Sequence, residues 1–551
     1  MRNLQGVSLV AKTLARRFEI PPPTTEFTVH RGVRVPMRDG VDLIATHYEP
    51  DTAAPSGTLL VRCPYGRGFP FTTLFGAVYA ARGYHVLIQS VRGTFGSGGE
   101  FTPMVNEAAD GADTVAWLRT QPWFTGSFAT IGLSYLGFTQ WALLMDPPPE
   151  MKAAVVTVGP HDFSASSWGT GSFSLNDFLG WSDMMAHQED GGRVRTGLRQ
   201  VTSRRALART TGQLPLGESA RALLRDGAPW YESWLEHPDA ADPFWNALKV
   251  GDALDRVDVP VLLIGGWQDL FLDQTVQQYR HLRDRGVTTA LTVGAWTHTQ
   301  IMTKAAPTVL RESLAWLDEH LRGIAGPPRS RVRVEIVHDG WIDLPDWAPA
   351  MAEHTMYLQP AHRLSDQPAP DGGAPSSFTY DPATPTPTLG GRLLSPEGGY
   401  RRDDALALRA DVLDFTGDPL PADLYIIGTP VIELAHTCDN PDNDVFVRVS
   451  EVDAKGRSHN VTDGFRRLTD DSGPLRLELD DVAYRFSAGS RIRVLIAGGS
   501  HPRFARNLGT GEAVITGSAM KPARHVVHHG DGGQSRLILP TGPTPPIPDG
   551  A

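Results

Sequence analysis

The sequence has few of the features that mark secreted, membrane-spanning or nucleic-acid-binding proteins. Only 2 of its 551 residues are cysteines, and because Cys63 and Cys438 are far apart, we expect reduced thiols rather than a disulfide framework. No run of about 18 apolar residues occurs, which argues against a membrane span. The amphipathic stretch from Leu4 to Arg17 lacks a signal-peptide cleavage site, so we expect a surface helix there. The net charge is −11 without lysine and arginine clusters, so neither nucleic acid nor a membrane is an expected partner, and we predict a cytoplasmic protein.

The sequence does contain enough hydrophobic residues to form the cores of several folding units. A chain of 551 residues that is 41% hydrophobic exceeds what one core usually organises. From about residue 26 to 150, strand-like runs alternate with helix-like stretches, which is typical of a mostly parallel sheet. Trp- and Arg-rich helical sequence then runs to about residue 247, and the strand pattern resumes at Val259. Beyond about residue 330, short alternating segments separated by Gly, Pro and Asp turns predict an all-β region.

One serine stands where a predicted strand meets a predicted helix. Ser134 follows the apolar run 128–132 and precedes the helix-like stretch 135–145, within the sequence Gly-Leu-Ser-Tyr-Leu-Gly. This is the G-x-S-x-x-G form of a nucleophile elbow, in which small neighbours let strand and helix approach closely. A plain Gly-Ser turn would give the same letters, but the position between strand and helix favours the elbow.

A serine hydroxyl needs a base within reach and an acid that orients the base. In this kind of fold the three follow in the order Ser, Asp, His. Asp269 comes after the apolar strand 259–264, and His298 comes after the strand 290–293. We therefore predict a catalytic triad of Ser134, Asp269 and His298.

Other acidic and histidine residues compete for these roles. Asp252 and Asp258 precede the strand and would lie at its wrong end, and Asp273 is one turn further, on the expected following helix. His281 and His161 are the alternative bases.

Acyl transfer also needs hydrogen-bond donors for the developing oxyanion. The backbone N–H of Tyr135, next after the nucleophile, is the expected first donor. The second should come from the loop 63–67, where Pro64 has no N–H but the phenol of Tyr65 can donate. A tyrosine that merely packs at a strand end is the alternative interpretation of Tyr65.

Together these motifs resemble the cocaine-esterase-type hydrolases, which are grouped with X-Pro dipeptidyl peptidases and α-amino-acid ester hydrolases. The resemblance covers most of the chain and extends into its C-terminal part. It is carried by the segments 61–65, 91–93 with 97–101, 113–118, 132–141, 266–269, 296–298, 444–449, 456–458, 461–464 and 502–507. Relatives usually have an Asp two positions before the Arg of their D-x-R-G pattern, where this chain has Ser90 before Arg92.

The resemblance implies an α/β architecture in three parts. These are a discontinuous α/β-hydrolase domain (1–147 and 246–330), an inserted helical cap (148–245) and a C-terminal β jelly roll of galactose-binding-like type (331–551). It also implies the triad and the two oxyanion donors named above, and it places Trp168, Trp181 and Phe271 along the acyl pocket. Each of those aromatics is equally interpreted as ordinary core.

The residues after Asp269 bear on the substrate. Leu270 and Phe271 are apolar, and burying a substrate ammonium without a carboxylate is unfavourable, although Asp177 and Asp183 of the cap remain candidates for such a role. We therefore predict hydrolysis of a small-molecule ester, without metal or cofactor, since His525, His528 and His529 are explained by a solvated strand end or turn. An X-Pro dipeptidyl peptidase, an acyltransferase and an inactive carbohydrate- or partner-binding protein are the alternatives, and a homodimer is left open.

Overall fold

The computed structural model describes residues 12–542 except 14, 191–192, 470–473 and 531–532, so the helix expected from Leu4 lies largely outside the described residues. The chain folds into two compact units. The first comprises Met1–Phe163, Trp245–Gly266 and Asp273–Val332, and the second comprises Ser164–Phe244, Trp267–Leu272 and Arg333–Ala551. Among the described residues, no helix is both long and apolar enough to cross a membrane.

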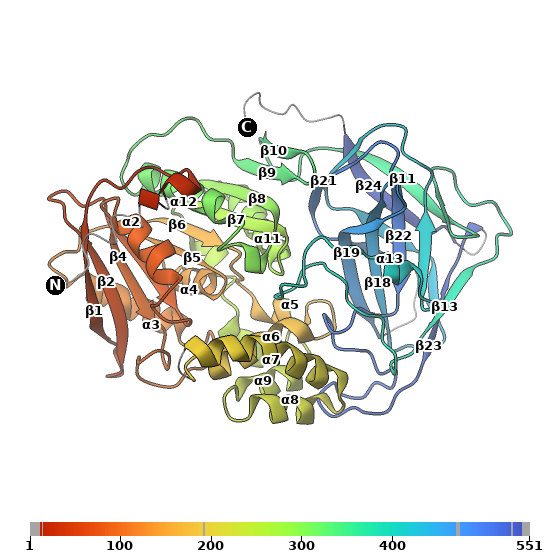
Figure 1. Ribbon diagram of the computed structural model, residues 1–551, viewed down its shortest axis with the longest axis horizontal. Helices are drawn as coiled ribbons and strands as arrows, with labels where there is room; N and C mark the ends of the chain where they lie inside the picture. The colour runs from red at the N-terminus through yellow and green to blue at the C-terminus, as the bar shows by residue number, and fades with distance from the viewer. Residues whose placement is uncertain (1–11, 14, 191–192, 470–473, 531–532, 543–551) are drawn as a thin grey trace. The chain divides into compact units, whose positions relative to one another are not determined.

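The first unit is built on a sheet with the strand order β1-β2-β4-β3-β5-β6-β7-β8 (Figure 1). β2 pairs antiparallel with both β1 and β4, whereas β4, β3, β5, β6 and β7 run parallel. Every residue of β3, β4, β5 and β7 is buried, as expected for parallel strands covered on both faces. The strands are β1 (Phe27–Pro36), β2 (Asp42–Pro50), β3 (Thr58–Cys63), β4 (His85–Ser90), β5 (Phe128–Leu133), β6 (Met151–Thr157), β7 (Val261–Gln268) and β8 (Thr289–Thr297).

The helices of this unit follow the apolar periodicity of the sequence. α12 has Pro307 in its first turn, where a missing N–H does no harm, and it buries Leu310, Leu314 and Leu317 along one face. The helices and short turns are η1 (Thr72–Ala77), α2 (Val78–Ala80), α3 (Glu107–Leu118), α4 (Tyr135–Leu143), α10 (Ala253–Arg256), α11 (Leu272–Asp284), η3 (His298–Gln300) and α12 (Ala306–His320).

β7 extends four residues beyond the end of the apolar run that predicted it. The pattern ended at Ile264 because Gly265 and Gly266 have little strand propensity. The sheet keeps them because a Cβ at Gly266 would lie 2.4 Å from Cδ1 of Trp296, so glycine makes room for that ring. Both predicted triad partners therefore follow their strands directly.

The second unit contains helices of the expected cap region and the C-terminal strands. Backbone bonds join them: Asn176 N–H donates to Pro502 O at 2.9 Å, and Gly217 N–H donates to Ile515 O at 2.9 Å. The three-part division therefore stays a prediction. The helices expected to form a separate cap lie in the same compact unit as the C-terminal strands. The helices are α5 (Phe163–Trp168), α6 (Leu175–His187), α7 (Arg193–Gly212), α8 (Leu216–Leu224), α9 (Trp230–Glu236) and α13 (Asp404–Ala407), and η2 (Pro243–Leu248) spans the unit boundary.

The C-terminal strands form an 11-stranded sheet with the main order β19-β18-β22-β14-β12-β11-β24-β15-β21 and a 3-stranded sheet, β13-β23-β17. β16 and β20 pair off the main path. The strands of these two sheets are β11 (Ala352–Gln359), β12 (Arg363–Ser365), β13 (Ser376–Tyr380), β14 (Val412–Thr416), β15 (Leu424–Gly428), β16 (Val431–Leu434), β17 (His436–Cys438), β18 (Asn443–Val452), β19 (Ser458–Leu468), β20 (Leu475–Glu478), β21 (Val482–Phe486), β22 (Arg491–Ala497), β23 (Ala523–Val527) and β24 (Arg536–Gly542). β9 (Val332–Ile336) and β10 (Gly340–Leu344) instead follow β8 in the strand order of the 10-stranded sheet.

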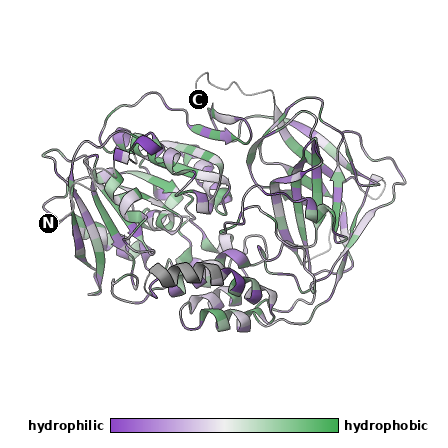
Figure 2. Cartoon of the chain, viewed as in Figure 1, coloured by the Kyte–Doolittle hydropathy of each residue, from purple (hydrophilic) through white to green (hydrophobic). Residues whose placement is uncertain are grey.

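The expectation of a solvated strand end was wrong for His525 and His529, whereas His528 is partly exposed just after β23. His525 lies in β23, is fully buried and has its Nδ1 3.0 Å from Nε2 of His436. His529 is also buried, with Nε2 3.0 Å from Ser376 Oγ. Hydrophobic residues concentrate along the strands inside each unit (Figure 2). His525 and His529 are polar exceptions, and one ring nitrogen of each contacts a neighbouring strand. Both cysteines are free and buried, as predicted.

A buried charge cluster stabilises the β region of the second unit. The carboxylate of Asp463 accepts from Arg503 at 2.5 Å and from Arg448 at 2.9 Å, and all three side chains are almost fully buried. Burial alone would raise the pKa of Asp463, but the two guanidiniums outweigh it and hold that pKa well below its usual range.

Replacing Asp463 with Asn should destabilise the protein by about 3–5 kcal/mol, because it removes the negative charge between two buried cations. The carboxylate contributes fully above its unfolded pKa of about 3.9, and the contribution disappears as the pH falls through the lower folded pKa. Urea unfolding of wild type and variant at neutral and acidic pH measures both effects. Asp453→Asn, which breaks the exposed pair with Arg457, is the control; an equal loss in that variant would contradict the account.

Candidate active site

Ser134 stands at a sharp turn between β5 and α4. Its backbone is left-handed, with φ 58° and ψ −125°, a conformation that a serine adopts only under constraint. Its N–H donates to Thr157 O of the neighbouring strand at 3.0 Å, and its carbonyl accepts from Gly137 N–H at 2.7 Å. Between Ile131 and Gln140 every residue except Ser134 is buried, so the turn presents this residue toward solvent.

Glycines make this turn sterically feasible. A Cβ at Gly137 would lie 2.5 Å from Cα of Gly159, in the segment after β6, and a Cβ at Gly132 would lie 2.5 Å from Cβ of Leu136. Such distances are far below van der Waals contact, so α4 can approach the sheet this closely only without side chains there. This is the close strand-to-helix approach that a nucleophile elbow requires.

Asp269 is the first residue after β7 and is fully buried. Its Oδ1 accepts from the N–H of Phe271 at 2.7 Å, which fixes one carboxylate oxygen on the backbone. β5, β6 and β7 are parallel neighbours, and Asp269 follows the last residue of β7, in a short segment that belongs to the second unit.

His298 is the first residue after β8, the next strand of the sheet, and is buried. Thr297 and Gln300 form a capping box around it, with the N–H of Thr297 donating to Gln300 Oε1 at 3.0 Å. Ile301 and Met302, just beyond it, line a cavity of about 30 Å³ together with Gly132 and Leu133 of the elbow. The segments that carry Ser134 and His298 are therefore neighbours within the first unit.

The competing candidates have other roles. Asp252 is the residue before α10, ahead of β7, and Asp273 lies in the first turn of α11, on the following helix as the sequence predicted. His281 pairs with Asp255 at 2.7 Å on the surface. His161 is buried beside Gln278, with 3.0 Å between Nδ1 and Nε2, and burial lowers its pKa to about 4.

Of the two expected oxyanion donors, Tyr135 is the first residue of α4 and Tyr65 lies two residues after β3. Tyr65 is partly exposed, and its ring stacks on Phe71 with 6.1 Å between centroids. The hydroxyl of Tyr135 points away from such a role, because it accepts from Met104 N–H at 2.7 Å and donates to Glu107 Oε1 at 2.7 Å. Only the backbone of Tyr135 is thus left to serve an oxyanion.

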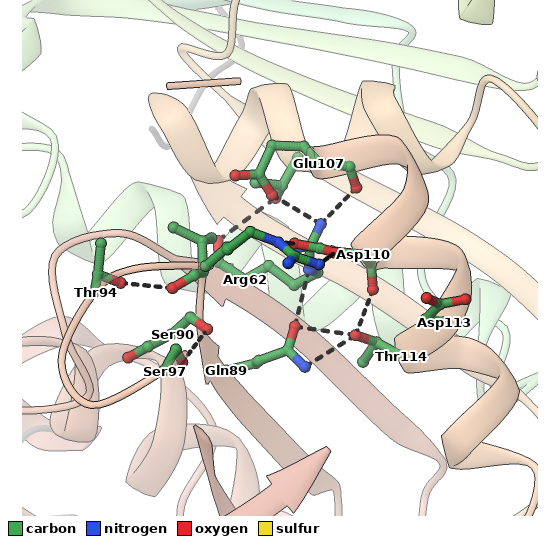
Figure 3. A network of polar contacts seen from close by, with 12 residues as sticks. Arg62, Gln89, Ser90, Thr94, Ser97, Glu107, Asp110, Asp113 and Thr114 are labelled. Carbon is green, nitrogen blue, oxygen red and sulfur yellow. Dashed lines mark hydrogen bonds and ion pairs between the residues drawn. The ribbon is translucent and has the colours of Figure 1, made fainter. Parts of the chain in front are cut away.

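Through Glu107, the Tyr135 hydroxyl belongs to a buried polar network that the sequence did not predict. Figure 3 shows Glu107, Arg62 and Gln89 of this network. Glu107 contacts Arg62 of β3, with 2.9 Å between Oε2 and Nη1, and Arg62 also donates to Gln89 at 2.9 Å. Burial raises the pKa of Glu107 even though Arg62 opposes that effect. The network therefore links β3, which ends two residues before Tyr65, with Tyr135, the residue directly after Ser134. An acidic residue at a helix start usually complements the helix dipole, so no sequence pattern indicates this role for Glu107.

Ser90 replaces the Asp that relatives usually carry, and the structure supplies other partners for Arg92. Its Nη2 lies 2.6 Å from Asp110 Oδ1, and its Nη1 lies 2.7 Å from Asp39 Oδ2. Ser90 instead accepts a hydrogen bond from Arg67. The missing family carboxylate is therefore replaced by one from α3.

The predicted pocket aromatics Trp168 and Trp181 lie in the aromatic core of the cap helices. Trp168 Nε1 donates to Trp234 O at 2.8 Å, and the ring of Trp181 stacks on that of Trp234 with 6.0 Å between centroids. Trp168 also lines a cavity of about 240 Å³ within the second unit. Phe271 is buried just after Asp269. The substrate-contacting role of all three stays a prediction.

The strand order of the first unit and the serine turn after β5 define an α/β-hydrolase. The sequence profile of X-Pro dipeptidyl-peptidase (S15 family) matches residues 39–300, and that of the X-Pro dipeptidyl-peptidase C-terminal non-catalytic domain matches residues 322–538. The chain thus resembles X-Pro dipeptidyl-peptidases in both its N-terminal and its C-terminal part.

Individual relatives agree with this assignment. The cocaine esterase of Rhodococcus sp. (strain MB1 Bresler) is 28% identical over 575 residues, which cover 93% of this chain and 98% of the esterase. An α-amino acid ester hydrolase shares the fold with a TM-score of 0.79 at 21% identity, over 94% of this chain and 97% of its own. An aminopeptidase from a marine-sediment Thaumarchaeota archaeon does so with a TM-score of 0.78 at 21% identity, over 93% and 96%. They confirm the predicted α/β-hydrolase fold with a C-terminal β-rich domain.

Tyr135→Phe should lower hydrolytic turnover by about 5- to 100-fold with little change in KM, because the Tyr135 amide is the expected oxyanion donor and a small displacement of it would weaken only transition-state binding. Steady-state kinetics and unfolding measurements on the same preparations test this. Tyr84→Phe is the matched control, since it also removes a tyrosine hydroxyl that contacts a carboxylate, Asp318 Oδ1 at 2.8 Å, elsewhere in the unit. Equal turnover in both variants would contradict a positioning role.

Proposed function

We propose that this protein is a serine hydrolase that cleaves carboxylic esters through an acyl-enzyme on Ser134, with His298 as general base and Asp269 as the orienting acid. The position of Ser134 carries the proposal. It is held in a left-handed turn after a buried strand and is the one incompletely buried residue of its segment. A nucleophile needs both properties: a fixed backbone and access to substrate.

In the proposed reaction, Ser134 Oγ attacks the ester carbonyl while His298 takes up the hydroxyl proton. The tetrahedral intermediate collapses, the C–O bond to the alcohol breaks, and His298 returns the proton to the departing oxygen. Water, deprotonated by the same histidine, then attacks the acyl-enzyme; the bond between the acyl carbon and Ser134 Oγ breaks, His298 returns the proton to that oxygen, and the carboxylic acid leaves. Asp269 holds the imidazole and stabilises its protonated form.

The backbone N–H of Tyr135 and the hydroxyl of Tyr65 are proposed to stabilise the oxyanion in both steps. The fixed side chain of Tyr135 supports this assignment, because its bonds to Met104 and Glu107 hold the donor before substrate arrives. A donor that is already in place needs no reorganisation during the reaction.

The charges around the expected acyl site favour a neutral acyl group. Asp177 Oδ1 accepts from Leu394 N–H at 2.8 Å, and Asp183 Oδ2 accepts from Ser203 Oγ at 2.8 Å. Both carboxylates thus serve the second unit's own structure, which supports an ester substrate over one with a buried ammonium. Trp168, Trp181 and Phe271 are proposed to contact the acyl group.

The name of the relative from Rhodococcus, a cocaine esterase, supports ester hydrolysis. The description of the matching family, X-Pro dipeptidyl-peptidase, supports the alternative that the chain cleaves peptides after an X-Pro unit. Both reactions use the same acyl-enzyme chemistry and differ in what the pocket admits.

Removing any member of the triad should abolish most activity. Ser134→Ala, Asp269→Asn and His298→Ala should each lower kcat by about 10⁴-fold or more. Asp273→Asn and His281→Ala change the nearest competing carboxylate and histidine along the chain and should retain wild-type kcat. Hydrolysis of an aryl ester by the five purified variants measures this; substantial activity in Asp269→Asn together with loss in Asp273→Asn would reassign the acid.

Parallel assays with an uncharged aryl ester and an X-Pro anilide test the substrate class. We expect the higher kcat/KM with the ester, because the carboxylates of the cap are engaged within the fold. Ser134→Ala serves as the blank for both substrates. Faster turnover of the anilide would reject the ester preference while leaving the nucleophile intact.

A further inference from the structure

Two histidines and a glutamate lie together at the edge of the sheet in the first unit. β1 and β2 pair so that His30 stands opposite His47 and Thr28 stands opposite Glu49. Side chains two residues apart on a strand, and those directly opposite across an antiparallel pair, share one face of the sheet. His30, His47 and Glu49 therefore point the same way, and one ligand atom from each lies within 4.8 Å of the other two.

The contacts within this cluster already resemble those of a coordination site. His30 Nε2 lies 2.7 Å from Glu49 Oε2, and the rings of His30 and His47 are nearly parallel with centroids 5.6 Å apart. The side chains of His30 and Glu49 are 47% and 45% exposed, while His47 is buried. The cluster thus has one fixed member inside the fold and two members that can rotate at its surface.

His47 is held by neighbours on its inner side. Its Nε2 lies 3.0 Å from Nδ1 of His85 on β4, and the ring of Trp123 stacks on it with centroids 3.9 Å apart and an 18° interplanar angle. When His47 donates the hydrogen bond to His85, its own Nδ1 carries a lone pair. An outer hydrogen bond that fixes ring orientation and tautomer is what metal-ligating histidines usually have.

The chemistry of the three ligand atoms determines which metal ions can bind to this cluster. Two imidazoles and one carboxylate suit Zn²⁺ and similar transition metals, whereas Ca²⁺ and Mg²⁺ prefer oxygen ligands alone. Ligand atoms about 2.0–2.1 Å from a tetrahedral ion are about 3.3 Å apart. Rotation of the exposed side chains of His30 and Glu49 is enough to reach that spacing, and it leaves the fourth position open to water.

We propose that His30, His47 and Glu49 form a binding site for a divalent transition metal, Zn²⁺ in the first instance. The site joins β1 to β2. β1 is the edge of the sheet, and among the described strands it pairs with β2 alone. An ion bound there cross-links the edge strand to its neighbour and stabilises the folded chain by mass action.

Calorimetric titration of chelator-treated full-length protein with Zn²⁺ tests the proposal, with Co²⁺ absorption spectra reporting ligand geometry. Wild type should bind one ion per chain at this site and show a higher Tm with Zn²⁺. His30→Ala and Glu49→Gln change exposed side chains and should weaken binding by about 100-fold or more, since even outer partners of a ligand contribute about 10- to 100-fold. His85→Ala should give a smaller loss.

His281→Ala is the matched control, because it also removes an exposed histidine that contacts a carboxylate, and it should bind Zn²⁺ like wild type. Ester hydrolysis by His30→Ala should stay at the wild-type rate, which separates this site from the proposed triad. Absence of Zn²⁺ binding in wild type, or equal binding in wild type and His30→Ala, would overturn the proposal.

Discussion

Ser134 can occupy its left-handed backbone conformation because the chain has no side chains at the three glycines around it. A Cβ at Gly137 would fall 2.5 Å from Gly159 Cα, so the approach of α4 to the segment after β6 depends on both residues. The same approach fixes the start of α4 at Tyr135, directly after Ser134 at the end of β5. The other parts of the proposed site are positioned relative to this contact.

Buried arginines and carboxylates near that contact form ion pairs in which positive and negative charges face each other, and these pairs hold the surrounding segments in place. Arg62 faces Glu107 inside the first unit, and Asp110 is shared between Arg62, at 4.0 Å, and Arg92, at 2.6 Å. A buried ion pair of this kind contributes little net stability compared with apolar residues in its place. Removing one partner, however, strongly destabilises the fold, because it leaves a buried charge without its counter-charge. Such a network holds the first residue of α4 in one place, which suits a backbone amide that must meet a developing oxyanion.

Much of the fold can be predicted from local sequence, because the spacing of apolar residues along each segment agrees with the strand or helix that the segment forms. The apolar run 128–132 predicts β5, and the apolar residues that alternate with charged ones in 332–336 form β9. The stretch 367–399 is rich in Pro, Gly, Ser and Thr, a composition typical of a surface connection, yet β13 lies inside it. β13 forms because β23, more than 140 residues later, supplies its hydrogen bonds, and no local signal carries such pairing. The roles of Glu107 and of the His30 cluster cannot be predicted from local sequence for the same reason. Glu107 of α3 meets residues of β3 and α4, and His30 of β1 meets residues of β2, so each depends on how separate elements pack together. Ser134, by contrast, was found because the elbow is encoded in six consecutive residues.

The central claim is that Ser134 is the activated nucleophile, and covalent labelling tests it most directly. Folded protein treated with a fluorophosphonate, then analysed as intact protein and as peptides by mass spectrometry, should carry one adduct per chain, on the peptide that contains Ser134. Denatured protein should remain unlabelled, because the activation belongs to the fold. An unlabelled folded protein, or an adduct on another residue with Ser134 unmodified, would contradict the account.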